Sequence, residues 1–189
     1  MDIQEYTELR SKLIKIRRVA RVMKGGKRFR LSALVAVGDG NGRVGVALGK
    51  AQETVAAIKK AEERAKRRMI KVPIVNGTIP HEVIGRCSAA RIFLKPASPG
   101  TGVIANLNVR AVLELAGIKN VIAKSLGSNN VINLIWATMD ALSKLRSREE
   151  IMKARFGPQE EEETIPEREM KQIKQSTKRK RKFKQSTTS

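Results

Sequence analysis

The apolar positions of the first 50 residues change from a helical period to a period of two. Up to Ile14 they recur as Tyr6, Leu9 and Leu13, the spacing of one helix face, which predicts a short helix over residues 2–14. From residue 29 to 37 every second residue is apolar, as in a strand with one buried face. The predicted order of this part is one helix followed by three strands.

Glycine-rich turns separate the predicted strands. One turn is predicted at Lys24-Gly25-Gly26-Lys27, and another at Asp39-Gly40-Asn41-Gly42, which carries the strongest short signal for a hairpin. In the returning strand, apolar residues alternate with small ones as Val44, Gly45, Val46, Ala47, Leu48 and Gly49.

The same glycines invite comparison with nucleotide-binding loops, because Gly40, Gly42 and Gly45 fit the pattern GxGxxG. Such a loop binds phosphate only where it leads directly into a helix N-terminus, whose free amides meet the anion. Here residues 46–49 still belong to the predicted strand. The P-loop pattern fails as well, since Val44 stands in place of its first glycine and Ala51 supplies no hydroxyl for magnesium. The sequence therefore argues against a nucleotide site.

A helix is predicted from Gln52 to about Arg68, with one apolar face and one basic side. The expected inward residues are Val55, Ile58, Ala61, Ala65 and Met69. The basic side, Lys60, Arg64 and Arg67, has two interpretations: a solvated helix face, or an end that faces RNA. We favour the second, because further lysines and arginines lie nearby and only three glutamates oppose them.

A connector with Pro73, Asn76-Gly77 and Pro80 predicts a domain boundary. Beyond it, strands are expected near residues 82–86, 91–95 and 120–126, with an irregular Pro- and Gly-rich loop over 96–102. Amphipathic helices are expected near residues 109–116, ended by Gly117, and 131–145.

Charge points to a polyanionic partner. The 189 residues carry a formal net charge of +21, and ten of the residues from Arg10 to Arg30 are basic while none is acidic. No apolar run has membrane-spanning length, so membrane insertion is not expected, and the polar start Met1-Asp2-Ile3-Gln4-Glu5 predicts no targeting leader. Only 3% of residues are aromatic, which favours double-helical RNA or DNA over single strands that stack on aromatic platforms.

Residues 157–189 differ in character from the rest. The acidic run of residues 160–163 precedes the basic run of 178–182 amid Gln, Ser and Thr, with little to form a core. The basic run could be a nuclear signal, but residues 1–150 are themselves basic, so we favour a disordered arm that lies along phosphates.

Few residues suggest metal binding or catalysis. The single Cys87 excludes an internal disulfide and is expected to be a small buried thiol rather than a reactive one, and the single His81 is expected to be a loop residue. Asp39, Glu114 and Asp140 do not have the spacing of paired catalytic carboxylates. We therefore predict no catalytic residues, no metal and no cofactor, and treat an enzyme as the weakest alternative.

Several motifs, in order, resemble one family. They are Lys24-Gly25-Gly26-Lys27-Arg28-Phe29, "LVAVGDGNGRVGVALGKA", "VPIVNGTIPHEV", "LKPASPGTGVIA" and "RAVLELAGIKNVIAKSLGSNN". Over roughly residues 8–155 the chain resembles the bacterial-type small-subunit ribosomal protein five family.

The resemblance implies an α+β fold in two domains. It implies a double-stranded-RNA-binding-like domain over residues 1–72 with the order α-β-β-β-α, a connector over 73–83, and an α/β domain with a left-handed crossover over 84–156. The disordered basic tail of 157–189 goes beyond the usual family ending.

The resemblance also implies a function and partners. The protein would be a structural constituent of the small ribosomal subunit in the cytoplasm of a bacterium, or encoded in an organelle. It would bind small-subunit rRNA, contact ribosomal proteins four and eight, lie near messenger RNA at the entry channel, and affect translational accuracy. The loop from Lys24 to Lys27 matches the family's rRNA-contacting hairpin, near the site of spectinomycin-type drugs.

Charge and resemblance together give the candidate site residues. For rRNA they are Arg17, Arg18, Arg21, Lys24, Gly25, Gly26, Lys27, Arg28, Arg30, Lys60, Arg64, Arg67 and Lys124. For the contact with protein four they are Thr101, Asn106 and Arg110, where Asn106-Leu107 replace paired glycines of the family. The alternative function is a free-standing duplex-RNA-binding regulator.

Overall fold

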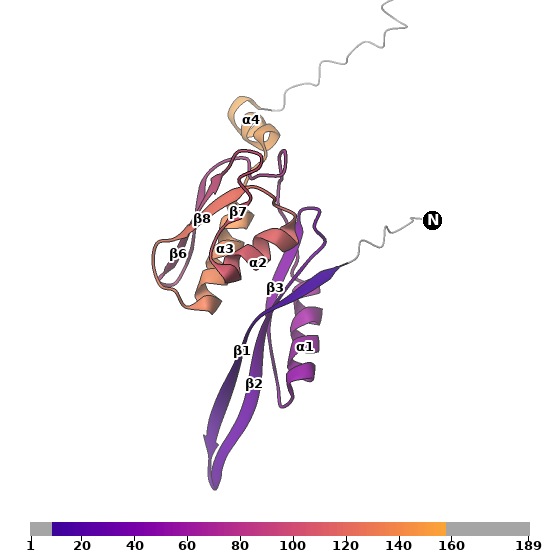
Figure 1. The fold of residues 1–189 in the computed structure, drawn as a ribbon, viewed down its shortest axis with the longest axis vertical. Helices are drawn as coiled ribbons and strands as arrows, with labels where there is room; N and C mark the ends of the chain where they lie inside the picture. Colours follow the sequence, from indigo (N-terminus) through magenta and orange to yellow (C-terminus); the bar gives the residue numbers. More distant parts are fainter. Residues whose placement is uncertain (1–8, 158–189) are drawn as a thin grey trace, which may run out of the picture. The chain divides into compact units, whose positions relative to one another are not determined.

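Two four-stranded sheets and four helices form the part of the chain that the computed structural model describes, residues 9–157 (Figure 1). The α+β class predicted from the sequence is thereby confirmed. The first sheet has the order β1-β2-β3-β4, with β1 at Arg10–Met23, β2 at Gly26–Gly38, β3 at Arg43–Ala51 and β4 at Ile70–Lys71. All of its neighbouring strands are antiparallel.

The second sheet has the order β5-β6-β8-β7. Its strands are β5 (Val83–Cys87), β6 (Ala90–Pro96), β7 (Val103–Ile104) and β8 (Val121–Ser125), and only β7 and β8 are parallel. The helices are α1 (Thr54–Lys66), α2 (Leu107–Ala116), α3 (Val131–Lys144) and α4 (Arg148–Phe156). The short strands β4 and β7 and helix α4 were not predicted.

The predicted N-terminal helix is wrong where the structure can test it. Residues 1–8 lie outside the described part, and from Arg10 onward the chain is the strand β1. The described order is thus three strands and a helix. The reason is tertiary: Leu13 pairs with Val35 of β2, and pairing along the whole strand outweighs a weak local helical period.

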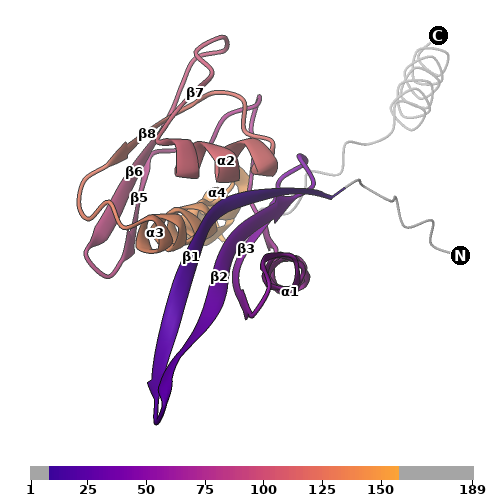
Figure 2. The same cartoon turned by 60° about the horizontal axis from the view of Figure 1, so that its bottom comes forward.

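Helix α1 lies directly on one face of the first sheet (Figure 2). Ala57, Ala61 and Ala65 of the helix are fully buried there. On the strand below, a Cβ at Gly45 or Gly49 would overlap the backbone of α1, so glycine permits the close approach. Two predicted inward residues, Ala61 and Ala65, are confirmed, but Val55 is 76% exposed because the buried stripe runs through the alanines.

The opposite face of the first sheet is also buried. Leu34 and Ala36 of β2, together with Val44 and Val46 of β3, belong to the same hydrophobic cluster as α2, α3 and the second sheet. The sequence had predicted only the alternate face of β2, that of Ala33, Val35 and Val37, as buried. Both sheets therefore belong to one compact unit, which ends at Ile151. The predicted connector of residues 73–83 begins just after β4 and ends at the first residue of β5, and the division into domains stays a prediction.

The β2–β3 turn connects the two halves through backbone atoms. The amides of Gly40 and Gly42 donate to the carbonyls of Leu115 and Ala116 at 3.0 and 2.9 Å, at the C-terminal end of α2. Gly117 ends this helix in the left-handed conformation, as predicted, and a Cβ there would overlap the carbonyl of Gly40. The amides of the glycine motif thus hold a helix end and not a phosphate.

Helices α2 and α3 cover the inner face of the second sheet, where Gly85 of β5 lies against the backbone of α3 (Figure 2). Between residues 9 and 157 no helix is long and apolar enough to span a bilayer. The tail predicted from residue 157 lies, beyond that first glycine, outside the described residues.

The close approach at Gly117 predicts a large effect of a small substitution. Gly117→Ala should lower the free energy of unfolding by about 3 kcal/mol, because the new methyl group meets the Gly40 backbone in addition to the strain of a left-handed residue. Gly100→Ala is the matched control. Its φ of 91° equals that of Gly117 within 2° but nothing lies within 4 Å, so about 1 kcal/mol is expected. Urea denaturation measures both, and equal losses would contradict this account.

Candidate RNA-binding surface

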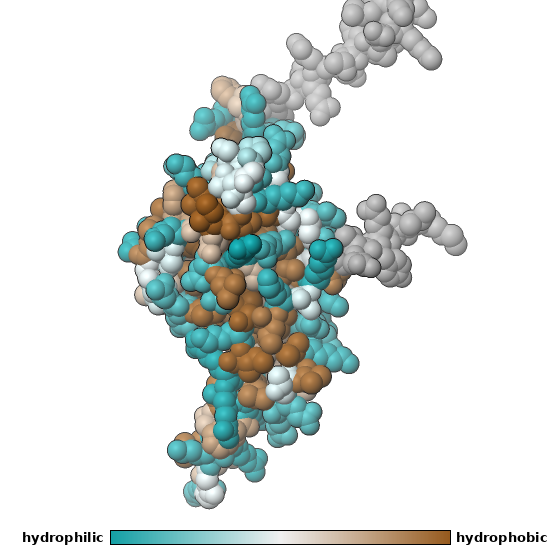
Figure 3. All heavy atoms as spheres, in the orientation of Figure 1, coloured by the Kyte–Doolittle hydropathy of each residue, from teal (hydrophilic) through white to brown (hydrophobic). Residues whose placement is uncertain are grey.

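The hairpin of β1 and β2 continues beyond the sheet that it begins. The pairing with β3 starts at Leu31, so residues 26–30 of β2 have only residues 19–23 of β1 as a partner (Figure 1). We call residues 15–32 the β1–β2 ribbon. Every residue from Lys15 to Arg30 is exposed or half-buried, and none of them is acidic. Figure 3 shows hydrophilic side chains next to paler and apolar ones on its projecting part.

Strand pairing places four of the seven predicted cations of the ribbon on one of its sides. Residues that pair directly lie on the same face, and Arg21 pairs with Arg28 while Val19 pairs with Arg30. This side, here called the cationic side, carries Lys15, Arg17, Arg21, Arg28 and Arg30. Lys15 was missed as a candidate, although it lies in the same acid-free run. The direct pairing of Arg21 with Arg28 is repulsive and favours the binding of an anion between them.

A β-bulge in β1 determines which side becomes cationic. Leu13 pairs with Val35 and Lys15 with Leu34, so Ile14 is an extra residue in the ladder. Before the bulge, Ser11 donates to Glu62 of α1 at 2.9 Å, so odd-numbered residues lie on the α1 side. After it, Arg17 donates to Asn130 beside α3 at 3.2 Å, so odd-numbered residues lie on the opposite side.

The other side of the ribbon, here called the mixed side, combines apolar residues with two of the predicted cations, Arg18 and Lys27. The guanidinium carbon of Arg18 lies 3.7 Å from the centroid of the Phe29 ring, a cation–π contact. The apolar members of this side are Ile16, Ala20, Val22, Phe29 and Leu31.

The turn of the ribbon consists of Lys24 and Gly25, and Gly26 already pairs with Met23. Gly25 and Gly26 have φ angles of 92° and 145°, and a Cβ at either position would have no atom within 4 Å. These glycines are therefore not required for packing inside the protein. They leave the backbone open to a close approach from outside.

The remaining predicted RNA residues lie elsewhere. Lys60, Arg64 and Arg67 are exposed on and just after α1, where Arg64 donates to the carbonyl of Leu48 at 3.1 Å. Lys124 is exposed on β8 and pairs with Phe93, on the face of the second sheet away from α2 and α3. The structure thus groups the ribbon residues and leaves Lys124 on a separate surface.

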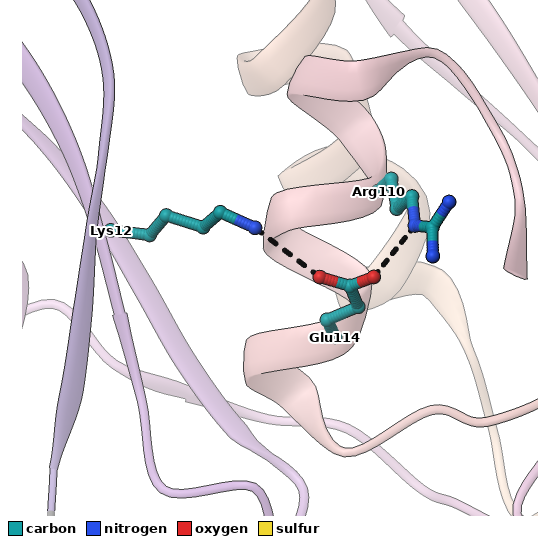
Figure 4. A network of polar contacts seen from close by, with 3 residues as sticks. All are labelled: Lys12, Arg110 and Glu114. Carbon is teal, nitrogen blue, oxygen red and sulfur yellow. Dashed lines mark hydrogen bonds and ion pairs between the residues drawn. The ribbon is translucent and has the colours of Figure 1, made fainter.

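The predicted partner residues lie at and before the start of α2. Asn106 is its N-cap and accepts from the amide of Asn108 at 3.4 Å, while Thr101 is exposed in the preceding loop. Arg110 donates from Nε to Glu114 at 2.6 Å, and Lys12 of β1 reaches the other carboxylate oxygen at 3.3 Å (Figure 4). The hydrogen bond from Arg110 is the main cause that lowers the pKa of Glu114, with help from Lys12 and against a smaller opposing effect of burial.

The other titratable candidates have structural contacts. The Asp39 carboxylate accepts from the amides of Asn41 and Arg43 within the β2–β3 turn, and both ring nitrogens of His81 bond to the backbone, at Glu82 and Arg146. Although burial raises the pKa of Asp140, hydrogen bonds from Lys144 and the Arg86 amide lower it more. In residues 9–157 no three His, Cys, Asp or Glu residues gather as metal ligands would.

Comparison with known proteins places the chain in a family. Residues 9–73 match the family model "Ribosomal protein S5, N-terminal domain", and residues 85–155 match "Ribosomal protein S5, C-terminal domain". A relative from Syntrophobacter fumaroxidans, named small ribosomal subunit protein uS5, is 56% identical over 148 residues, which are 78% of this chain and 89% of the relative. The chain belongs to the ribosomal protein S5 family.

Other S5 relatives match over the same extent. The protein of Rubrobacter xylanophilus is 56% identical over 149 residues, covering 79% of this chain and 74% of its own. The Thermus thermophilus protein is 52% identical over 151 residues, 80% of this chain and 93% of its own. Both are named small ribosomal subunit protein uS5, and the resemblance read from the motifs is confirmed.

The ion pairs of Glu114 predict a dependence on pH in this S5 protein. Because its folded pKa is lowered, the carboxylate stabilises the fold at neutral pH, and this contribution is lost as acid titrates the group below its ordinary range. Glu114→Gln should therefore cost about 0.5 kcal/mol at pH 7, since both partners are half exposed, and less at pH 3.

Thermal melts of both proteins at the two pH values measure the difference. Glu63→Gln is the control, because this glutamate of α1 takes no part in the ion pairs among residues 9–157. A Glu114→Gln deficit of the same size at pH 3 would show that the carboxylate acts through packing and not through charge.

Proposed function

We propose that this protein is a structural constituent of the small ribosomal subunit and binds small-subunit rRNA through the β1–β2 ribbon. The observation that carries the proposal is the ribbon itself, a two-stranded extension without an acidic residue that holds five cations on one side. Such a surface is unfavourable in isolation and fits the closely spaced phosphates of folded RNA. The relatives' name, small ribosomal subunit protein, supports the assembly in which that RNA occurs.

The finer assignments belong to the same proposal. The turn at Lys24 to Lys27 contacts rRNA through backbone amides and lysines, and Lys60, Arg64, Arg67 and Lys124 make secondary contacts. Thr101, Asn106 and Arg110 face ribosomal protein four, through which the protein affects accuracy. The guanidinium group of Arg110 has N–H donors besides the Nε donor that binds Glu114, so it can also bind a carboxylate of a partner protein.

The proposed place in the small ribosomal subunit also implies further neighbours. Ribosomal protein eight is the other expected neighbour, and messenger RNA passes near the entry channel. The protein acts in the cytoplasm, without catalysing a reaction. The first domain is proposed to be similar in fold to double-stranded-RNA-binding domains, and its described part has the order β1-β2-β3-α1.

Removal of charge from the ribbon should weaken rRNA binding and its dependence on salt. Each phosphate contact that is lost reduces the slope of log affinity against log salt by about 0.9, because fewer counterions are released. The variant changes four residues to glutamine, namely Arg21, Lys24, Lys27 and Arg28. Filter-binding titrations with a small-subunit rRNA transcript across salt concentrations measure the slope.

A control variant with an equal change of charge distinguishes an effect of the ribbon residues from an effect of the overall net charge. It changes four exposed cations of other elements and loops to glutamine, namely Lys71, Lys95, Lys119 and Arg146. The ribbon assignment fails if both variants flatten the slope equally, or if neither does.

Gly26→Val tests close approach at the turn. The new side chain meets no atom of the protein within 4 Å of its Cβ, so the fold should persist, with some strain from the positive φ. Incorporation into small subunits should fall, and sensitivity to a spectinomycin-type drug should change, while a circular dichroism melt stays close to wild type. Normal incorporation with unchanged drug response would reject the contact.

A free-standing duplex-RNA-binding regulator is the second candidate, since the cationic side alone does not distinguish rRNA from another duplex. Cosedimentation decides between them. The ribosomal proposal expects the full chain in the small-subunit fraction at physiological salt, and a regulator would stay in the soluble fraction.

A further inference from the structure

The mixed side of the ribbon exposes apolar side chains that are not part of the hydrophobic core. Val22 is 74% exposed and Phe29 47% exposed, and the pair lies beyond the last residue that β3 supports. A two-stranded ribbon has no core of its own, so these residues gain little from folding. The same side of the ribbon carries Arg18 and Lys27, which keeps the surface basic.

The contact between Arg18 and Phe29 brings two planar groups together on the mixed side, and we call this pair the platform. The guanidinium group lies over the ring at 3.7 Å, so one planar group covers one face of the other. Arginine planes and aromatic rings are the surfaces on which unpaired RNA bases stack. Paired bases inside a duplex offer no such face, because their neighbours already cover both sides.

The two sides of the ribbon cannot both contact the same straight duplex. The cationic side and the mixed side face opposite directions, since neighbouring residues of a strand alternate between faces. A straight duplex can reach only one of them. An RNA in which a duplex is interrupted by unpaired nucleotides can place phosphates on one side and a base on the other.

We infer that the ribbon recognises a duplex interrupted by unpaired nucleotides: the cationic side holds the phosphates, and an unpaired base stacks on the platform of Arg18 and Phe29. The inference rests on the proposed RNA-binding function and adds the class of RNA. The cations supply affinity that falls with salt. The platform supplies a preference for the unpaired base, and this preference does not fall with salt.

Two synthetic RNAs test this with the full chain. One is a perfectly paired duplex, and the other is the same duplex with two unpaired nucleotides in one strand, one of them the fluorescent base 2-aminopurine. Wild-type protein should bind the interrupted duplex roughly tenfold more tightly, with the same salt slope for both RNAs. Stacking should change the 2-aminopurine fluorescence on binding.

Two variants remove the platform without removing charge. Phe29→Ala deletes the ring, and Arg18→Lys keeps the cation but loses the planar group. Both should abolish the tenfold preference and the fluorescence change while leaving the salt slope as in wild type. Phe156→Ala is the matched control, because it truncates a phenylalanine that is 67% exposed outside the ribbon, and it should keep the preference.

The outcomes separate the two levels of the proposal. Equal affinity of the wild type for both RNAs, or a preference that survives in both platform variants, overturns the inference. If the four-residue charge variant still flattens the slope in that case, the proposed function stands without the platform. If the wild type binds neither RNA, both the proposed function and the inference fail.

Discussion

The contact between the β2–β3 turn and the end of α2 fixes the arrangement of this protein. Backbone meets backbone there, with the amides of Gly40 and Gly42 on the last carbonyls of α2, and neither Gly38 nor Gly117 has room for a side chain. Hydrogen bonds of this kind allow little sliding, because moving by one residue would leave the amide of the buried Gly42 without its acceptor. Strand β2 runs from this turn into the ribbon, and β2 and β3 together form the surface on which α1 lies. The contact therefore fixes the position of both.

Burial on both faces of β2 explains how so exposed a ribbon is held in place. Residues 31–38 of this strand lie between α1 on one face and the shared core on the other, which anchors the near half of the hairpin firmly. The far half contributes charge and no core. The energy that organises the proposed RNA-binding surface therefore comes from buried residues outside that surface, and the side chains of the ribbon are not needed for the core.

Sequence reasoning succeeded where local chemistry decides the structure. The turn at residues 39–42, the end of α2 at Gly117 and helix α3 all follow from positive-φ residues or strong periodicity. It failed where tertiary contacts decide. The spacing of Leu9 and Leu13 fits a helix, but pairing with β2 makes it a strand, and Val55 gives way to smaller alanines because α1 lies so close to its sheet.

The candidate site shows the same division. The acid-free run identified the ribbon cations from the sequence, because charge is visible without a fold. Their distribution over two sides was not predictable, since it requires the register of β1 against β2. The interaction of Arg110 with Glu114 was not predictable either. Glu114 also binds Lys12, which lies about a hundred residues away in the sequence.

The β-bulge at Ile14 decides on which face of the ribbon each later side chain of β1 lies. Amino-acid composition does not determine this. If Ile14 paired with Leu34 instead of remaining outside the ladder, every later residue of β1 would move by one partner and change faces. Arg17 and Arg21 would then join Phe29, while Arg18 and Val22 would join Arg28. No charge would be lost, yet neither a cationic side nor a stacking platform would remain. Beyond Lys15, substitutions therefore keep the two sides of the ribbon in place, whereas a one-residue slip of β1 against β2 exchanges them.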